Sequence, residues 1–290
     1  MRFGAHLPIA AFGGRLAGRH LLIEYAETAE ALGFSTLCAN DHLVFSVPWM
    51  DALVALGVAA GRTSRVRLMT TAALLAVRGA APLGSALAAL QHLSEGRLAA
   101  AVTPGSSLSD YEAIGEDFGS RWPRFDAEVP RLRAYLQKVI PDAPPPIWIA
   151  SWGSEVGLRR VARLGDGWLA SAYHGTPQHL QESLAYLGAR LASLGKDPVE
   201  FPAALATTYM YMSEDPVALR SALELVVSPT AAPSDLRDRL LIGTPEECVD
   251  RVRQLGAAGI KEVFVWPVRD ELLQLRLFAE EVIPRVNGRR

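Results

Sequence analysis

The sequence contains few of the residues that hold together disulfide-rich or zinc-binding proteins. Its two cysteines, Cys38 and Cys248, stand far apart and outside any Cys-x-x-Cys or Cys/His spacing. A zinc finger or a disulfide framework is therefore excluded, and we expect two free thiols in a reducing compartment. No stretch approaches the ~20 consecutive apolar residues of a membrane span. Residues 1–14, interrupted by His6 and Pro8, make a poor signal peptide. The sequence thus predicts a cytoplasmic protein.

An excess of one charge is also missing. The 29 lysines and arginines nearly balance the 31 aspartates and glutamates, and the formal net charge at pH 7 is −2. Such a chain has no built-in attraction to nucleic acid or to an anionic membrane. With 50% hydrophobic residues, it has the composition of a globular protein and not of a disordered one. We expect residues 1–290 to form a single domain.

Short apolar runs alternate along the chain with stretches of helical periodicity. In the first such stretch, apolar residues recur at helical spacing up to Leu32, and Gly33 provides a stop. The stretch 215–239 is less regular. The predicted strands are 3–7, 35–39, 66–71, 98–102, 147–150, 167–170, 203–210 and 262–266. The predicted helices are 19–32, 50–62, 83–93, 125–138, 155–164, 178–194, 216–227, 245–258 and 271–282.

Eight strand–helix units predict the fold. Near-continuous apolar strands that alternate with helices are typical of a parallel sheet covered by helices. Eight such units in one chain favour an α/β fold of the (β/α)8 TIM-barrel type. The alternative is a doubly wound open sheet, which would place a glycine fingerprint after the first strand. The sequence there, His6-Leu7-Pro8-Ile9, contains no glycine, so the barrel is preferred.

Chemistry in a barrel belongs at the carboxyl ends of the strands, and here those ends lack several kinds of reactive group. A metal-dependent hydrolase needs several ligands, but only His6 and His42 are available there, and we predict no metal. A glycosidase needs carboxylates where this chain has Thr103 and Met210. A Schiff-base enzyme needs a lysine on a strand. None of the three lysines, at 138, 196 and 261, ends a predicted strand.

The strand ends instead offer backbone turns, hydroxyls and aromatic rings. That combination suits a large planar cofactor, which brings its own reactivity. The turn Trp152-Gly153-Ser154 lies between a strand and a helix. Unpaired N–H groups and the helix dipole at such a position favour a phosphate, although a plain helix cap explains the same residues.

Seven stretches, in this order, resemble the bacterial-luciferase-like superfamily of flavin-dependent monooxygenases and coenzyme F420-dependent oxidoreductases. The likeness covers essentially the whole chain, and the ordered set is more specific than any single motif. The stretches are Ala26-Glu27 with 31–34, Asn40-Asp41-His42, 93–98, 111–115 with Phe118 and Arg121, 146–150, 165–168 and 243–248.

The resemblance implies a luciferase-like TIM barrel, a homodimer and redox chemistry, with the cofactor ring across the strand ends. In the F420-using branch an Asp-His pair lies beside the reactive ring, and Asp41 and His42 occupy those positions. The histidine would move the proton and the aspartate would fix its tautomer. A cis non-proline peptide is expected at Thr71-Ala72 or Ala72-Ala73. Other residues implied to contact the cofactor are Thr103, Gly105, Ser106, Ala150, Trp152, Gly153 and Ser154.

The chain departs from the family pattern in three places. Members usually show Arg, one residue and then Pro before the third helix, whereas Arg78 and Pro82 are here separated by three residues. After the fourth strand, Thr103-Pro104-Gly105 replaces a Gly-x-Gly. In the sugar-phosphate dehydrogenases of the F420 branch an acid follows the last glycine, and this chain has Ser106. A sugar-phosphate substrate is therefore disfavoured.

We accordingly expect an oxidoreductase that moves a hydride between F420 and a small to medium, mostly apolar substrate. His42 and Asp41 would be catalytic, and His6, His174, Tyr209 and Trp266 would shape the substrate pocket. One alternative is an FMN-dependent monooxygenase that uses O2 and flavin reduced by a separate reductase. The other is a flavin-binding protein without turnover.

Overall fold

Eight parallel strands close into a barrel in the computed structural model, which describes residues 1–227 and 233–288. The ring closes because β9 pairs with β1 on one side and with β7 on the other, while β6 pairs with β7. The open-sheet alternative is therefore wrong, and the predicted (β/α)8 barrel is confirmed. The barrel strands are β1 (Arg2–His6), β2 (Thr36–Ala39), β3 (Arg67–Leu74), β4 (Leu98–Thr103), β5 (Ile147–Ala150), β6 (Gly167–Ser171), β7 (Ala203–Met212) and β9 (Glu262–Pro267).

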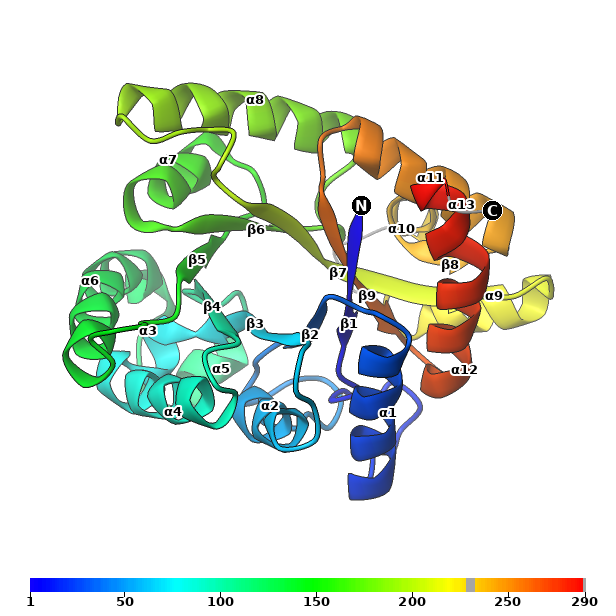
Figure 1. Cartoon of the computed structure of the whole chain (residues 1–290), viewed down its shortest axis with the longest axis horizontal. Coiled ribbons are helices and arrows are strands. Elements are labelled where there is room, and N and C mark those ends of the chain that lie inside the picture. The colour runs from blue at the N-terminus through cyan, green and yellow to red at the C-terminus, as the bar shows by residue number, and fades with distance from the viewer. Residues whose placement is uncertain (228–232, 289–290) are drawn as a thin grey trace.

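Helices surround the strands (Figure 1), and most of them bury apolar residues against the outside of the barrel. Several begin at a capping side chain: Ser154, Thr176 and Thr244 each accept a backbone hydrogen bond from the first turn. The helices are α1 (Arg19–Ala31), α2 (Ala52–Ala60), α3 (Leu75–Arg78), α4 (Ala80–Leu93), α5 (Leu108–Glu112), α6 (Arg121–Val139), α7 (Glu155–Leu164), α8 (Pro177–Ser193), α9 (Pro216–Glu224), α10 (Pro233–Arg239), α11 (Pro245–Ala257), α12 (Glu271–Leu277) and α13 (Ile283–Asn287).

Two large rings and many small residues fill the barrel interior. Trp148 and Phe264 point inward among alanines of β4 and β7. The neighbouring strands make room for the rings with glycine, since a Cβ at Gly4 would lie 2.5 Å from Phe264 and a Cβ at Gly167 would lie 2.4 Å from Trp148. The interior is thus a packed core in its lower and middle layers.

An ion cluster closes the amino-terminal end of the barrel. Glu262, at the start of β9, is 1% exposed and receives two hydrogen bonds of 2.8 Å from the Arg67 guanidinium. Hydroxyls of Ser35 and Thr36 donate to the same carboxylate. Burial raises the pKa of Glu262, but the charge and hydrogen bonds of Arg67, together with the Arg2 charge and the Thr36 hydroxyl, outweigh burial and leave that pKa below its ordinary value.

The structure has two elements that the sequence does not predict, one inside the less regular stretch 215–239 and one just after it. They are α10 and the short strand β8 (Leu241–Gly243), and residues 228–232 lie outside the described part. The helix predicted at 216–227 ends earlier, at Glu224. β8 pairs with the end of β7, from Met210 to Met212. β6 pairs with the start of β7, from Ala203 to Ala206.

β6 and β8 share one edge of β7, because β9 occupies the other edge over both halves. Between the halves lies Thr207, whose φ of 57° falls in the left-handed region, and the β7–β9 register shifts there. This is the pattern of a bulge that bends a strand. The end of β7 therefore leaves β6 and is joined by β8.

The carboxyl-terminal segment is helical as expected, but a π-helical turn at Phe278–Val282 separates α12 from α13. Within the described residues, no helix combines the length and the apolar character needed to cross a membrane.

Candidate active site

The residues predicted to form the site come from the carboxyl ends of the eight barrel strands and the loops that follow them. All strands run in parallel, so these ends meet at one mouth of the barrel. His42 follows β2, and Thr71 and Ala72 lie in β3. Tyr209 and Trp266 lie near the ends of β7 and β9.

His42 is held by Asp110, a residue that the sequence does not single out. His42 Nδ1 lies 2.8 Å from Asp110 Oδ2, and the backbone N–H groups of Leu43 and Val44 donate to Oδ1 of the same carboxylate. Asp110 belongs to α5 and is fully buried. Burial raises its pKa, but the hydrogen bond and charge of His42 and the N–H groups of Val44 and Leu43 together outweigh burial and leave the pKa of Asp110 below its ordinary value. An ionised carboxylate therefore fixes the imidazole and the loop that carries it.

The prediction that Asp41 fixes the tautomer of His42 is wrong, because the carboxylate beside the His42 ring belongs to Asp110. Asp41 is turned toward β3 and α3, where the Arg78 guanidinium donates to both its oxygens at 2.8 and 2.7 Å. The N–H of Leu74 donates to Asp41 Oδ2. The partner of Asp41 is thus Arg78, the arginine whose distance from Pro82 departs from the family pattern. Sequence spacing indicates the two residues but not the direction of either side chain.

β3 carries a bulge at the mouth. Its register against β4 shifts between Thr70 and Ala73, and the peptide between Thr71 and Ala72 is cis, as the resemblance implied. The N–H of Ala72 donates to Asn40 Oδ1 at 3.2 Å. The bulge is therefore tied to the residues that directly precede His42.

One series of ring contacts joins all the predicted aromatic residues of the mouth. His6 and Trp266 stack at 3.3 Å, and both are almost fully buried. The structure therefore buries both rings instead of exposing them to an open pocket. The series includes Trp49 and Tyr173, which the strand ends do not indicate. In order, its members are His42, Trp49, Trp266, Tyr209, Tyr173, His174 and Trp152.

His6 is not available for proton transfer. Its Nδ1 lies 2.9 Å from the carbonyl of Leu7, and its Nε2 accepts the N–H of Asn40. Complete burial lowers the pKa of His6 to about 3, although the hydrogen bond to Leu7 opposes that shift. The ring is therefore neutral, with both nitrogens engaged.

A pocket of about 220 Å³ lies on the β4–β5 side of the mouth. Six of the predicted cofactor residues line it: Thr103, Gly105, Ser106, Ala150, Trp152 and Ser154. Arg121 and Arg160 also line it, and sequence reasoning missed both as site residues because they lie on helices and not at strand ends. Arg160 pairs with Asp126, whereas Arg121 has no carboxylate partner among residues 1–227 and 233–288. The pocket thus combines an apolar wall with positive charge.

The turn before α7 shapes one end of this pocket. Gly153 has a φ of 93°, and a Cβ there would lie 2.4 Å from His179 Nε2 and 2.6 Å from Ser183 Oγ. Only glycine fits this close approach. The next residue, Ser154, caps the helix by accepting the N–H of Gly157. The turn therefore presents the amino terminus of α7 to the pocket.

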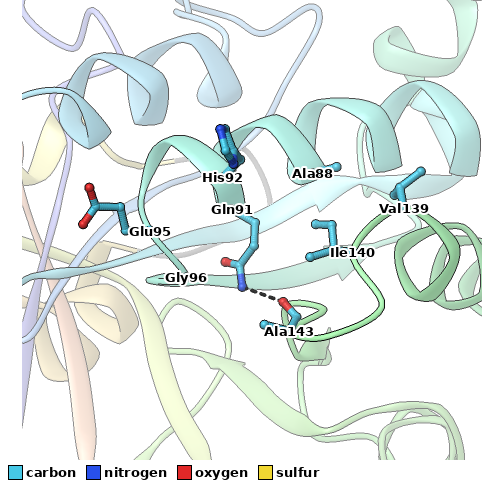
Figure 2. Close-up of a pocket in the computed structure, with 8 residues that line it drawn as sticks. All are labelled: Ala88, Gln91, His92, Glu95, Gly96, Val139, Ile140 and Ala143. Carbon is cyan, nitrogen blue, oxygen red and sulfur yellow. Dashed lines mark hydrogen bonds between the residues drawn. The ribbon is translucent and has the colours of Figure 1, made fainter.

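A larger pocket, about 400 Å³, lies at the opposite end of the barrel between the ends of α4 and α6 (Figure 2). Its Gln91 amide donates to the Ala143 carbonyl and accepts the N–H of Leu98. These bonds join loops at the amino-terminal face, where barrels rarely carry chemistry. Among the described residues, no group of three or more His, Cys, Asp or Glu side chains could hold a metal ion.

Comparison with known proteins gives the class. The family model for luciferase-like monooxygenases matches residues 1–235, and the chain belongs to this family. The predicted family and the prediction of an enzyme of this class are confirmed.

Individual relatives are more distant. An F420-dependent glucose-6-phosphate dehydrogenase of Amycolatopsis mediterranei is 24% identical, with 92% of this chain and 94% of that protein covered. The monooxygenase RslO1 from Streptomyces bottropensis has a similar structure, with a TM-score of 0.84, 22% identity and coverage of 98% and 99%. An F420-dependent secondary alcohol dehydrogenase in complex with an F420-acetone adduct has a TM-score of 0.78, 17% identity and coverage of 98% of each chain.

Proposed function

We propose that the chain is an F420-dependent oxidoreductase that transfers a hydride between F420 and a small to medium, mostly apolar organic molecule. The observation that carries the proposal is the His42–Asp110 pair at the end of β2. It places one imidazole, oriented by a buried carboxylate, at the mouth of a barrel whose other nearby histidine, His6, has both nitrogens engaged. The relative named as an F420-dependent dehydrogenase supports the choice of cofactor.

The residues of the mouth fit a cofactor with a planar ring and a phosphate-bearing side chain. The pocket on the β4–β5 side ends at the amino terminus of α7, where unpaired N–H groups and the helix dipole favour an anion. Arg121, with only a carbonyl of Phe118 as its hydrogen-bond partner in the described part of the chain, adds positive charge there. When bound, F420 would supply the ring carbon that accepts or gives the hydride.

His42 would hold and move the proton. Since its Nδ1–H is assigned to the Asp110 carboxylate, Nε2 carries the lone pair and faces no other partner among the described residues. This nitrogen can take the proton of a substrate hydroxyl as hydride leaves the adjacent carbon, or return it in the reverse direction. Asp110 stabilises the positive imidazolium that forms.

The aromatic series would exclude water and contact the apolar part of the substrate. Trp152 is 55% exposed and stacks on His174 at 3.8 Å. Burial, with the nearby Arg239 charge, lowers the pKa of His174 to about 4, so this ring is neutral at pH 7. The absence of an acid at Ser106 argues against sugar phosphates.

The rival function is an FMN-dependent monooxygenase, and the family description, which names luciferase-like monooxygenases, supports the monooxygenase part of it. A third hypothesis is a flavin-binding protein without turnover. The homodimer, the separate reductase and the cytoplasmic location stay predictions.

Titration of the purified protein with F420 and with FMN, read by fluorescence quenching, tests the proposal. We expect tighter binding of F420, followed by anaerobic hydride transfer to or from an alcohol, ketone or enone panel. Tighter binding of FMN with O2 consumption coupled to substrate would establish the monooxygenase. Tight binding without reduction or reoxidation by any acceptor would establish the non-catalytic protein.

A further inference from the structure

Two consecutive side chains before His42 are bonded to the neighbouring strand instead of the site. Asn40 Oδ1 accepts the N–H of Ala72 at 3.2 Å and the N–H of Asp41 at 2.8 Å. Asp41 Oδ2 accepts the N–H of Leu74 at 2.9 Å. Both side chains therefore bind backbone groups that flank the β3 bulge.

These bonds begin where the backbone ladder ends. The last paired residues of β2 and β3 are Ala39 and Thr70. Beyond them, the register of β3 against β4 is shifted until Ala73. Side chains of Asn40 and Asp41 thus continue the β2–β3 connection at the level of the mouth, where the main chain no longer provides it.

Arg78 holds the Asp41 carboxylate in place from the far side. Its guanidinium donates to both oxygens of Asp41 and, at 2.6 Å, to Asp51 Oδ2. Arg78 ends α3, which directly follows β3, and Asp51 caps α2. The Asp41 side chain is fully buried, so a two-point contact with an arginine is the partner that its charge requires.

We propose that Asp41, supported by Asn40 and Arg78, is a positioning residue that sets the distance between the His42 imidazole and the wall formed by residues 71–74. The inference rests on the proposed function, in which His42 moves a proton at the mouth. Three consecutive residues then have different tasks. Asn40 and Asp41 fix the wall, and His42, held by Asp110, faces the reaction. A cofactor ring that lies against this wall would therefore be held at a fixed distance from the His42 imidazole.

The first test needs no cofactor. Asp41→Asn keeps the size of the side chain but removes its charge and one acceptor. We expect faster amide hydrogen exchange at Ala72 and Leu74, by about tenfold or more, with the rest of the barrel unchanged. Asp51→Asn is the matched control, because it also removes a carboxylate from Arg78, but Asp51 makes no hydrogen bond to β3 in the described part of the chain. Unchanged exchange at Ala72 and Leu74 in Asp41→Asn would overturn the proposal.

The second test uses the loaded enzyme. Asp41→Asn is expected to lower kcat about tenfold or more with KM changed less than about threefold, since misplacement by a fraction of an ångström affects the reaction more than binding. The pH dependence of kcat should keep its shape. A changed shape, matching that of Asp110→Asn, would mean that Asp41 acts on the proton and would also overturn the proposal. If the native protein bound neither F420 nor FMN, the proposed function would fail while the exchange result still decided the positioning role.

Discussion

His42 Nδ1 and Asp110 Oδ2 lie 2.8 Å apart and join the loop after β2 to the helix that follows β4. The same carboxylate binds the N–H groups of Leu43 and Val44. Orientation of the imidazole and closure of the loop therefore depend on one residue.

Asp110→Asn should lower kcat about 10²-fold, because an amide leaves the imidazole without an ionised acceptor at Nδ1. Steady-state kinetics of the single variants and the double variant His42→Gln/Asp110→Asn measure the coupling. We expect the double variant to be no slower than His42→Gln alone, because the two residues act as one unit. Additive losses would show that Asp110 works independently of His42.

Glu262→Gln should lower the free energy of unfolding at pH 7 by about 2–4 kcal/mol, because Arg67 loses its buried partner. Since the pKa of Glu262 is lowered in the folded protein, its stabilisation is present above the ordinary glutamate pKa and is lost as pH falls through the folded value. In urea unfolding, the difference in the free energy of unfolding between wild type and Glu262→Gln should be smaller at pH 4 than at pH 7. The control is Glu27→Gln, whose half-exposed pair with Arg62 should contribute only about 0–1 kcal/mol.

His6→Gln should flatten the acid side of the stability profile. The folded pKa of His6 is about 3, below the ordinary value of 6.5. Below pH 6.5 the histidine binds a proton in the unfolded chain but stays neutral in the folded protein. The free energy of unfolding of wild type therefore falls with pH, and this group lowers it by about 2 kcal/mol at pH 5 relative to neutral pH. Glutamine keeps an acceptor for the Asn40 N–H. Urea unfolding at pH 7.5 and pH 5 checks this prediction, with the exposed His92→Gln as control. An equal change in the free energy of unfolding between the two pH values in wild type, His6→Gln and His92→Gln would contradict it.

Gly153→Ala should weaken cofactor binding at least about tenfold, because the new Cβ collides with His179 and Ser183 and moves the turn before α7. Gly195→Ala is a matched control. It also has a positive φ, 71°, but a Cβ there would meet no atom of the described residues within 4 Å. Gly195→Ala should lose about 1 kcal/mol of stability, and Gly153→Ala should lose more because of the collision. Only Gly153→Ala should change the quenching titration. Equal affinities would place the phosphate elsewhere.

The barrel could be predicted because its signals are local. The apolar runs and the stop at Gly33 each act within a few residues, and the barrel strands lie close to their predicted bounds. β8 was missed because so short a strand carries no measurable periodicity and is paired only through the end of β7. A contact of that kind depends on the tertiary fold.

The site residues are predicted from strand ends, and this explains which residues the prediction includes and which it lacks. Thr103, Ser106, Ala150 and Trp152 line one pocket, and their contact with a cofactor stays a prediction. Asp110 lies on a helix beyond the loop that ends β4, and its contact with His42 spans 68 positions. No spacing rule in the chain encodes such a pairing.

The division of the β7 edge between β6 and β8 makes the rim of the barrel unequal. On the β2–β3 side, side chains of Asn40 and Asp41 continue the wall beyond the last backbone pair. On the β6–β7 side, the strands diverge after Ala206 and the rings of Tyr173 and Tyr209 stand at the division. The wall of the mouth is thus continuous on the β2–β3 side and divided between two partner strands at β7. Chain length added between β7 and β8 would therefore change the divided side while leaving the hydrogen bonds of the β2–β3 side in place.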